Sequence, residues 1–132
     1  MTKKHLKIGQ IGERVAAAFL IKKGHQIIDK NYKKKFGEID LIAKAPDETL
    51  IFCEVKTSIN KKGIQISFAP EDHADKHKLN KMKRMAQFFS AKHPMFITEE
   101  KGWRIDLIAI TLEEAGDKKF LIKQIHHYEN VA

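Results

Sequence analysis

The chain has 132 residues, a length that suits one domain with a proper hydrophobic core, and we assign residues 1–132 to a single domain. Lys and Arg number 25 against 17 Asp and Glu, which gives a formal net charge of +8 and a sequence pI near 9.5. This excess favours a polyanionic partner, nucleic acid first, although a basic surface that serves only solubility fits the total equally well.

The cysteine content and the apolar segments restrict the compartment. Cys53 is the single cysteine, so an intrachain disulfide is excluded and a reducing cytoplasm fits. The apolar run at residues 15–21 is far shorter than the about 20 residues that span a bilayer, so no membrane partner is expected.

Helical periodicity dominates the N-terminal region. Apolar residues recur at helical spacing over residues 6–23, and Gly24 is well placed to end a helix there. Glu13 falls at the margin of the apolar stripe, where it could reach a neighbouring sheet. Taken alone, an ordinary exposed helix glutamate is the better interpretation of Glu13.

We expect a short strand at residues 26–30, followed by a polar, basic segment at residues 31–35 that leads to the central strands. Lys33, Lys34 and Lys35 form a run of charge that is usually a solvated loop. Because the run leads directly into the central strands, contact with a phosphate backbone is the functional alternative.

The central stretch, residues 36–57, contains two β-branched, aliphatic runs around a short polar break, which predicts two antiparallel strands joined by a turn. Alternation places Glu54 and Lys56 on one face of the second strand. Asp40 is embedded among aliphatic residues of the first strand, where an ionised carboxylate needs compensation. Asp40, Glu54 and Lys56 therefore form a constellation suited to holding a divalent cation and activating water.

The region after these strands predicts a loop and then a helix. Residues 57–68 show no confident periodicity, and we interpret them as a substrate-facing loop with an extended segment at residues 64–66. A helix is expected from Pro70 to about residue 92, ended by Pro94. Its apolar stripe comprises Leu79, Met82, Met85, Ala86 and Phe89, and its basic face, a solvated surface or a nucleic-acid contact, includes Lys78, Lys81 and Arg84.

Three further acidic or metal-binding candidates are weaker. His73 and His77 stand four apart, but solvent-facing histidines without a recognisable third ligand explain them better than a metal site. In the strand expected at residues 103–111, Asp106 is more readily paired with Arg104 or a lysine than recruited to a metal. A last strand is expected at residues 120–127, which completes an α/β fold.

The order of these elements and motifs resembles the PD-(D/E)XK nuclease superfamily, the restriction-endonuclease-like fold that includes archaeal Holliday junction resolvases. More closely, the chain is similar to the YraN family of small bacterial proteins. The matching segments span almost the whole chain and include Gly12-Glu13, Gly37-Glu38-Ile39-Asp40, Glu54-Val55-Lys56, Pro70-Glu71 and Arg104-Ile105-Asp106.

The resemblance implies an αβββαβ core with a mixed β-sheet flanked by helices. It also implies that Asp40 and Glu54 are metal ligands, that Lys56 is a catalytic lysine and that Glu13 is an additional acid of the site. Where the family often has an arginine two positions after the lysine, this chain has Ser58.

These features together predict a Mg²⁺-dependent or Mn²⁺-dependent endonuclease that hydrolyses DNA phosphodiesters, with branched or junction DNA among the candidate substrates. Two alternatives stay open: a nucleic-acid-binding module without turnover, and a structural or adaptor protein in which Glu54 and Lys56 simply pair. The sequence also leaves open whether two chains associate as a homodimer.

Overall fold

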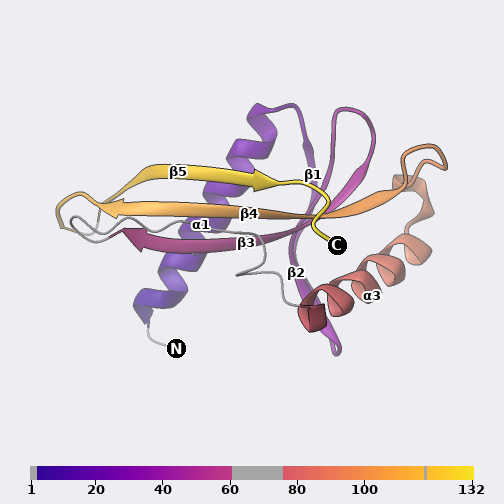
Figure 1. The fold of residues 1–132 in the computed structure, drawn as a ribbon, viewed down its shortest axis with the longest axis horizontal. Coiled ribbons are helices and arrows are strands. Elements are labelled where there is room, and N and C mark those ends of the chain that lie inside the picture. Colours follow the sequence, from indigo (N-terminus) through magenta and orange to yellow (C-terminus); the bar gives the residue numbers. More distant parts are fainter. Residues whose placement is uncertain (1–2, 61–75, 118) are drawn as a thin grey trace.

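A computed structural model describes residues 3–60, 76–117 and 119–132, with side chains of residues 3–7 excepted, as a five-stranded sheet with helices packed against it (Figure 1). The strand order is β1-β2-β3-β4-β5, with β3 and β4 parallel and every other pair antiparallel. The expected α/β class and αβββαβ core are therefore confirmed. The elements are α1 (Lys3–Lys22), β1 (Gln26–Lys34), β2 (Gly37–Lys44), β3 (Leu50–Asn60), α3 (Lys76–Lys92), η1 (Pro94–Phe96), β4 (Trp103–Glu114) and β5 (Phe120–Tyr128).

Helix α1 begins earlier than its apolar periodicity predicts, but it ends where expected. Gly24 has a φ of 92°, a left-handed conformation that glycine adopts without steric cost. The Gly24 amide donates to the Ile21 carbonyl and the His25 amide donates to the Leu20 carbonyl, both at 2.9 Å. This is the Schellman arrangement, and it satisfies carbonyls that the last helical turn leaves unpaired.

Strand β1 differs from the prediction for residues 31–35. The strand continues through Lys34, and only Lys35 and Phe36 form the turn into β2. Pairing explains the difference: Tyr32 lies opposite Ile39, and Lys33 lies opposite Glu38, so an opposite-charge pair supports the ladder. The three lysines therefore lie at the exposed tip of the β1–β2 hairpin and do not form an irregular loop.

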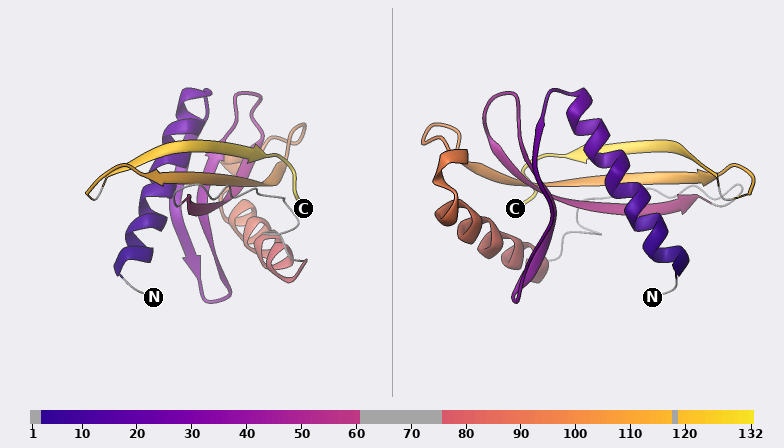
Figure 2. Two further views of the ribbon diagram at one scale, coloured as in Figure 1. Left: turned by 60° about the vertical axis from the view of Figure 1, so that its left-hand side comes forward. Right: turned by 180° about the vertical axis from the view of Figure 1, so that it is seen from behind.

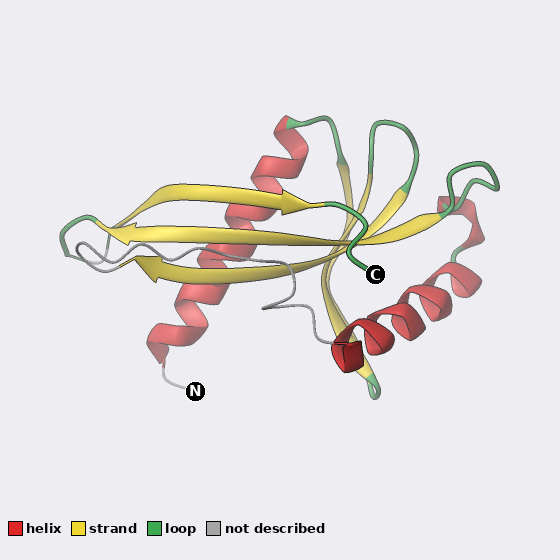
Figure 3. Ribbon diagram, in the orientation of Figure 1, coloured by secondary structure: helices red, strands yellow, loops and turns green. Residues whose placement is uncertain are grey.

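The β2–β3 hairpin confirms the reading of the central stretch. Asp47 Oδ1 accepts a hydrogen bond of 3.0 Å from the Thr49 amide in the turn. Strand β3 extends to Asn60, beyond the expected end of the strand. Figure 3 shows the β1–β2 hairpin turned steeply against the three long strands, and the described pairing of β2 with β3 stops at Leu41 and Cys53. The two strands therefore diverge beyond that point.

Parallel pairing of β3 with β4 requires a crossover, and α3 lies in the intervening part of the chain. The predicted end of this helix is confirmed, since α3 ends at Lys92 and Pro94 opens η1. Strands β4 and β5 both run slightly further than predicted. The expected helix start at Pro70, the extended segment at residues 64–66 and His73 lie outside the described residues.

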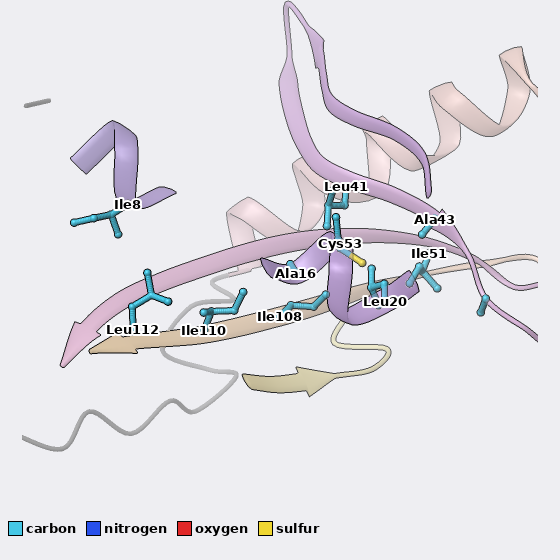
Figure 4. Packing of buried hydrophobic residues seen from close by; sticks show 12 residues of the cluster. Ile8, Ala16, Leu20, Leu41, Ala43, Ile51, Cys53, Ile108, Ile110 and Leu112 are labelled. Atoms are coloured by element: carbon cyan, nitrogen blue, oxygen red, sulfur yellow. The ribbon is translucent and has the colours of Figure 1, made fainter. Parts of the chain in front are cut away.

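Two apolar layers cover the two faces of the sheet, and Figure 2 shows the helices on opposite sides. On one face, Ala16 and Leu20 of α1 pack with alternate residues of the strands, among them Ile51, Cys53 and Ile108 (Figure 4). On the other face, the predicted stripe of α3 packs on the residues between them, including Ile42, Phe52 and Ile105. The buried Cys53 and the face alternation of β3 are both as predicted.

Gly12 sets how closely α1 approaches β3. A Cβ atom at this position would lie 1.7 Å from Thr57 Oγ1 and 2.8 Å from Thr57 Cβ. Only glycine permits this spacing, so Gly12 fixes the position of α1, and of its neighbour Glu13, over β3. Within the described ranges, no helix is long and apolar enough to cross a membrane.

Candidate active site

Asp40 lies where β2 and β3 diverge. Its Oδ2 accepts a hydrogen bond of 2.8 Å from the Val55 amide, a donor that has lost its opposing backbone carbonyl at the end of the ladder. The side chain thus replaces a backbone partner and holds the divergence of the strands in place. This bond also fixes the carboxylate relative to Glu54, the residue before Val55.

Asp40 and Glu54 line one cavity of about 140 Å³ on the α3 side of the sheet. Only 14% of the Glu54 side chain is exposed, and its Oε1 forms an ion pair with Lys78 Nζ of α3. The structure therefore brings together the two carboxylates that sequence reasoning selected. The described residues that line this acidic cavity are Glu38, Asp40, Glu54, Lys78 and Met82.

Burial and neighbouring charge both act on Asp40. The pKa of this carboxyl is raised from 3.8 to about 6, chiefly by burial, and the hydrogen bond from the Val55 amide opposes the rise. The negative charges of Glu13, Glu54 and Glu38, in that order, contribute to the same rise. A carboxyl whose pKa is raised by its surroundings, inside a cleft with other acids, is typical of functional sites.

The remaining members of the predicted set occupy different positions. Glu13 is partly buried on α1 and is near enough to Asp40 to raise its pKa, but it does not line the acidic cavity. Lys56 is exposed on β3 and does not line this cavity either. The lysine that contacts Glu54 is Lys78, which sequence reasoning assigned to the basic face of α3.

Two cavity residues were missed as members of the site, and the sequence held a signal for one of them. Glu38 is two positions before Asp40, so strand alternation places both on one face. Lys78 could not be chosen from the sequence because α3 carries several lysines and the pairing of a helix with a sheet face is a tertiary property.

The other predicted basic residues gather around the hairpin tip. Lys33, Lys34 and Lys35 of β1 and its turn line an open cavity of about 590 Å³ together with Lys81 and Arg84 of α3. An aromatic residue lies beside these cations, because Phe36 belongs to the same wall and 37% of it is exposed.

Asp106 is separate from the acidic cavity. It is fully buried, and it accepts hydrogen bonds from Arg104 Nε and the Asn130 amide, each at 2.9 Å. His127 Nε2 lies 2.8 Å from its other oxygen. Burial raises the pKa of Asp106, but the hydrogen bonds from His127 and Arg104 outweigh it and hold that pKa below its usual value. The expected pairing with Arg104 is confirmed, and by alternation Asp106 faces α1 with Ile108 rather than α3.

The fold and the cavity define a class: a small α/β domain whose mixed sheet carries a carboxylate pair where two central strands diverge. The sequence profile of the uncharacterised protein family UPF0102 matches residues 12–110, which include both carboxylates. The chain belongs to this family, so the YraN-like resemblance is confirmed at family level.

Relatives in several bacteria match over most of their length. A UPF0102 protein of Caldanaerobacter subterraneus subsp. tengcongensis is 34% identical over 124 residues, which cover 93% of this chain and 92% of the relative. One from Dictyoglomus thermophilum is 37% identical over 88% of this chain and 94% of its own length. One from Clostridioides difficile is 37% identical, with coverage of 92% and 93%.

Proposed function

We propose that the protein is a divalent-cation-dependent nuclease that hydrolyses phosphodiester bonds of DNA. The observation that supports this most directly is the shared cavity of Asp40 and Glu54, in which burial and the neighbouring acids raise the pKa of Asp40 to about 6. Ionising two partly buried carboxylates side by side costs free energy, and a bound cation would offset this cost. Resemblance to the PD-(D/E)XK superfamily and the net charge of +8 support the choice of nucleic acid.

The donors present fit Mg²⁺ or Mn²⁺ better than zinc, because the acids of the cavity offer only oxygen ligands. Among the described residues, no group of three or more His, Cys, Asp or Glu side chains could hold a metal by itself. Mg²⁺ commonly takes one or two carboxylates and completes its shell with water and substrate phosphate. Asp40 and Glu54 would hold the ion, which when bound polarises a phosphoryl oxygen and lowers the pKa of its water.

The chain's own groups then have distinct tasks. The Val55 amide orients Asp40, and the ion pair with Lys78 orients Glu54. Lys56, which the family resemblance selects, would move towards the phosphate and offset the negative charge that develops there. Glu13 adds negative potential near Asp40, which favours cation binding.

One observation favours a structural alternative, namely that Glu54 and Lys78 form a pair that only fastens α3 to the sheet. This alternative does not explain why position 40 carries an ionisable acid, because the hydrogen bond from the Val55 amide needs only an acceptor, whereas the Asp40 carboxylate has a raised pKa and three acidic neighbours. A binding module without turnover is disfavoured for a related reason, because acids close to a basic surface repel phosphate unless a cation intervenes.

Glu54→Gln separates binding from cleavage, since it preserves size and removes a metal-binding charge. We expect binding of DNA without metal at least as tight as in the parent, because repulsion of phosphate falls. Cleavage should decrease by a factor on the order of a thousand if several kcal/mol of transition-state stabilisation are lost. The measurement is a gel shift in EDTA paired with a Mn²⁺-dependent cleavage assay on labelled linear and branched DNA, with folding checked by circular dichroism. Undiminished cleavage by the folded variant would exclude the proposed mechanism.

Alanine at each lysine distinguishes their tasks. Lys56→Ala should reduce cleavage at every Mn²⁺ concentration, because it removes charge stabilisation. Lys78→Ala should instead lower the Mn²⁺ concentration that gives half-maximal cleavage, because the ammonium competes with the cation for Glu54. The opposite pattern would exchange the two assignments.

A further inference from the structure

Three adjoining cavities form one groove along α3 and β2. The outer cavity, of about 590 Å³, and a middle cavity of about 380 Å³ share Gly37, Glu38 and Lys81. The middle cavity and the acidic cavity share Glu38, Lys78 and Met82. We call this continuous depression the hairpin groove, and it leads from the hairpin tip to the carboxylate pair.

Charge changes along the hairpin groove. Among the described residues, five cationic side chains line its outer part, His77, Lys78 and Lys81 line its middle, and Asp40 and Glu54 line its inner end beside Lys78. Glu38 borders all three cavities, so the lining changes from mainly cationic to mainly acidic along the groove. A polyanion would be held at the outer part and in the middle, while its next phosphate would meet the acids and any cation they hold. The outer cationic residues are Lys33, Lys34, Lys35, Lys81 and Arg84.

An aromatic pair occupies the cationic end. Phe36 contacts Phe88 of α3 edge to face, with ring centroids 5.6 Å apart and an interplanar angle of 78°. The Arg84 guanidinium lies over the Phe36 ring at 5.8 Å from its centroid, and Lys34 Nζ lies 5.6 Å from the centroid of Phe88. Arg84 is exposed, so it can exchange its ring contact for a phosphate and release the face of Phe36.

The position of Phe36 is unusual on local grounds. Turns are dominated by Gly, Pro, Asn, Asp and Ser, whereas this turn holds Lys35 and a phenylalanine with 37% exposure. Local rules are most often broken at functional sites. An aromatic ring among phosphate-binding cations suits the π-face of an unpaired base, which a duplex keeps inside its own stack.

From these contacts, and resting on the proposed function, we infer that the hairpin groove binds a single-stranded segment of nucleic acid, with one base stacked on Phe36 and the backbone directed towards Asp40 and Glu54. Asp40 follows Phe36 by four residue steps along the strand, which at about 3.3 Å per step is a distance of about 13 Å. A strand crosses that distance within a few nucleotides. The substrate class is therefore DNA with an unpaired region next to the scissile phosphate.

Anisotropy of a labelled oligo-dT strand and of a duplex of equal length, measured in EDTA, tests this inference without cleavage. Phe36→Ala should weaken single-strand binding by about 5- to 150-fold, the usual loss for one stacked base, and change duplex binding less than about twofold. Its salt dependence should match the parent, because no phosphate contact is removed. Phe36→Trp should retain single-strand affinity.

Two controls separate stacking from charge and from general damage. Lys34→Ala should weaken the binding of both ligands. For the single strand, the slope of the logarithm of the binding constant against the logarithm of salt concentration should decrease in magnitude by about 0.7. Leu121→Ala removes another exposed apolar side chain, on β5, and should change neither affinity.

The inference is overturned if the folded Phe36→Ala variant binds the single strand as tightly as the parent does. It is also overturned if the substitution lowers the affinities for single strand and duplex equally. A parent that binds neither ligand also overturns it. Cleavage with Mn²⁺ is scored separately. If Phe36→Ala has the expected effect on single-strand binding but the parent never cuts DNA, only the nuclease proposal is refuted. If the parent cuts DNA and Phe36→Ala has no effect on single-strand binding, only the inference about the hairpin groove is refuted.

Discussion

Replacing Asp40 by Asn should make the protein more stable, and increasingly so as the pH rises. The pKa of Asp40 is raised from 3.8 to about 6, so between these values the folded state holds a proton that the unfolded state has lost. Stability therefore falls as pH rises through this window. Each pH unit of the shift corresponds to about 1.4 kcal/mol, so the full penalty above the window is about 3 kcal/mol. Asn cannot ionise, and its Oδ1 can still accept from the Val55 amide.

Urea unfolding of both proteins at several pH values, followed by circular dichroism, measures this difference. Between pH 5 and pH 8 the stability advantage of Asp40→Asn should grow by about 1.5 kcal/mol, since part of the penalty is already present at pH 5. Buffers must contain EDTA, because a bound cation would favour the ionised carboxylate and hide the effect.

Glu99→Gln provides the matched control, because it removes an exposed carboxylate in the segment before β4. The pH dependence of this variant should follow that of the parent. A difference between Asp40→Asn and the parent that stays constant across the pH range would mean that folding does not raise the pKa of Asp40. The main electrostatic argument for the candidate site would then fail.

Two further predictions concern the framework. Gly12→Ala should destabilise the protein by about 1–3 kcal/mol, because the new methyl would overlap Thr57. Adding Thr57→Ala to the same chain should recover part of this loss. Equal urea midpoints for Gly12→Ala and the parent would contradict the close approach of α1 to β3. Asp106→Ala should cost about 3–5 kcal/mol, because it leaves Arg104 and His127 without their buried partner. The pKa of Asp106 is lowered, so its stabilisation is present above the ordinary carboxyl pKa and declines as the pH falls through the folded value. A parent-like acid unfolding profile in Asp106→Ala would contradict this assignment.

Local pattern was sufficient for most of the fold. Alternation along β3 correctly assigned Phe52 and Cys53 to opposite faces, and the end of α1 followed from Gly24. The extent of β1 was missed because Lys33 and Lys34 look like loop residues until pairing with β2 is known. Cross-strand partners, rather than intrinsic preference, decide such strands.

The candidate site was predictable where its residues share a hairpin. Asp40 and Glu54 stand on adjacent strands, so periodicity and turn position are enough to bring them together. Lys78 and Phe36 meet their partners only through the docking of α3, which no local pattern specifies. Sequence reasoning therefore found the acids and overlooked both the cation that contacts them and the aromatic ring of the hairpin groove.

The mixed sheet also leads us to expect an order of events during folding. Partners at the β2–β3 turn, Lys44 and Leu50, are close along the chain, whereas Leu50 meets Trp103 of β4 only after a long loop has closed. We therefore expect the carboxylates to become neighbours through local pairing, before the crossover brings α3 and its lysines to the sheet. We expect substitutions in β4 to slow folding more than substitutions near the acids do, because the distant parallel pairing controls the folding rate.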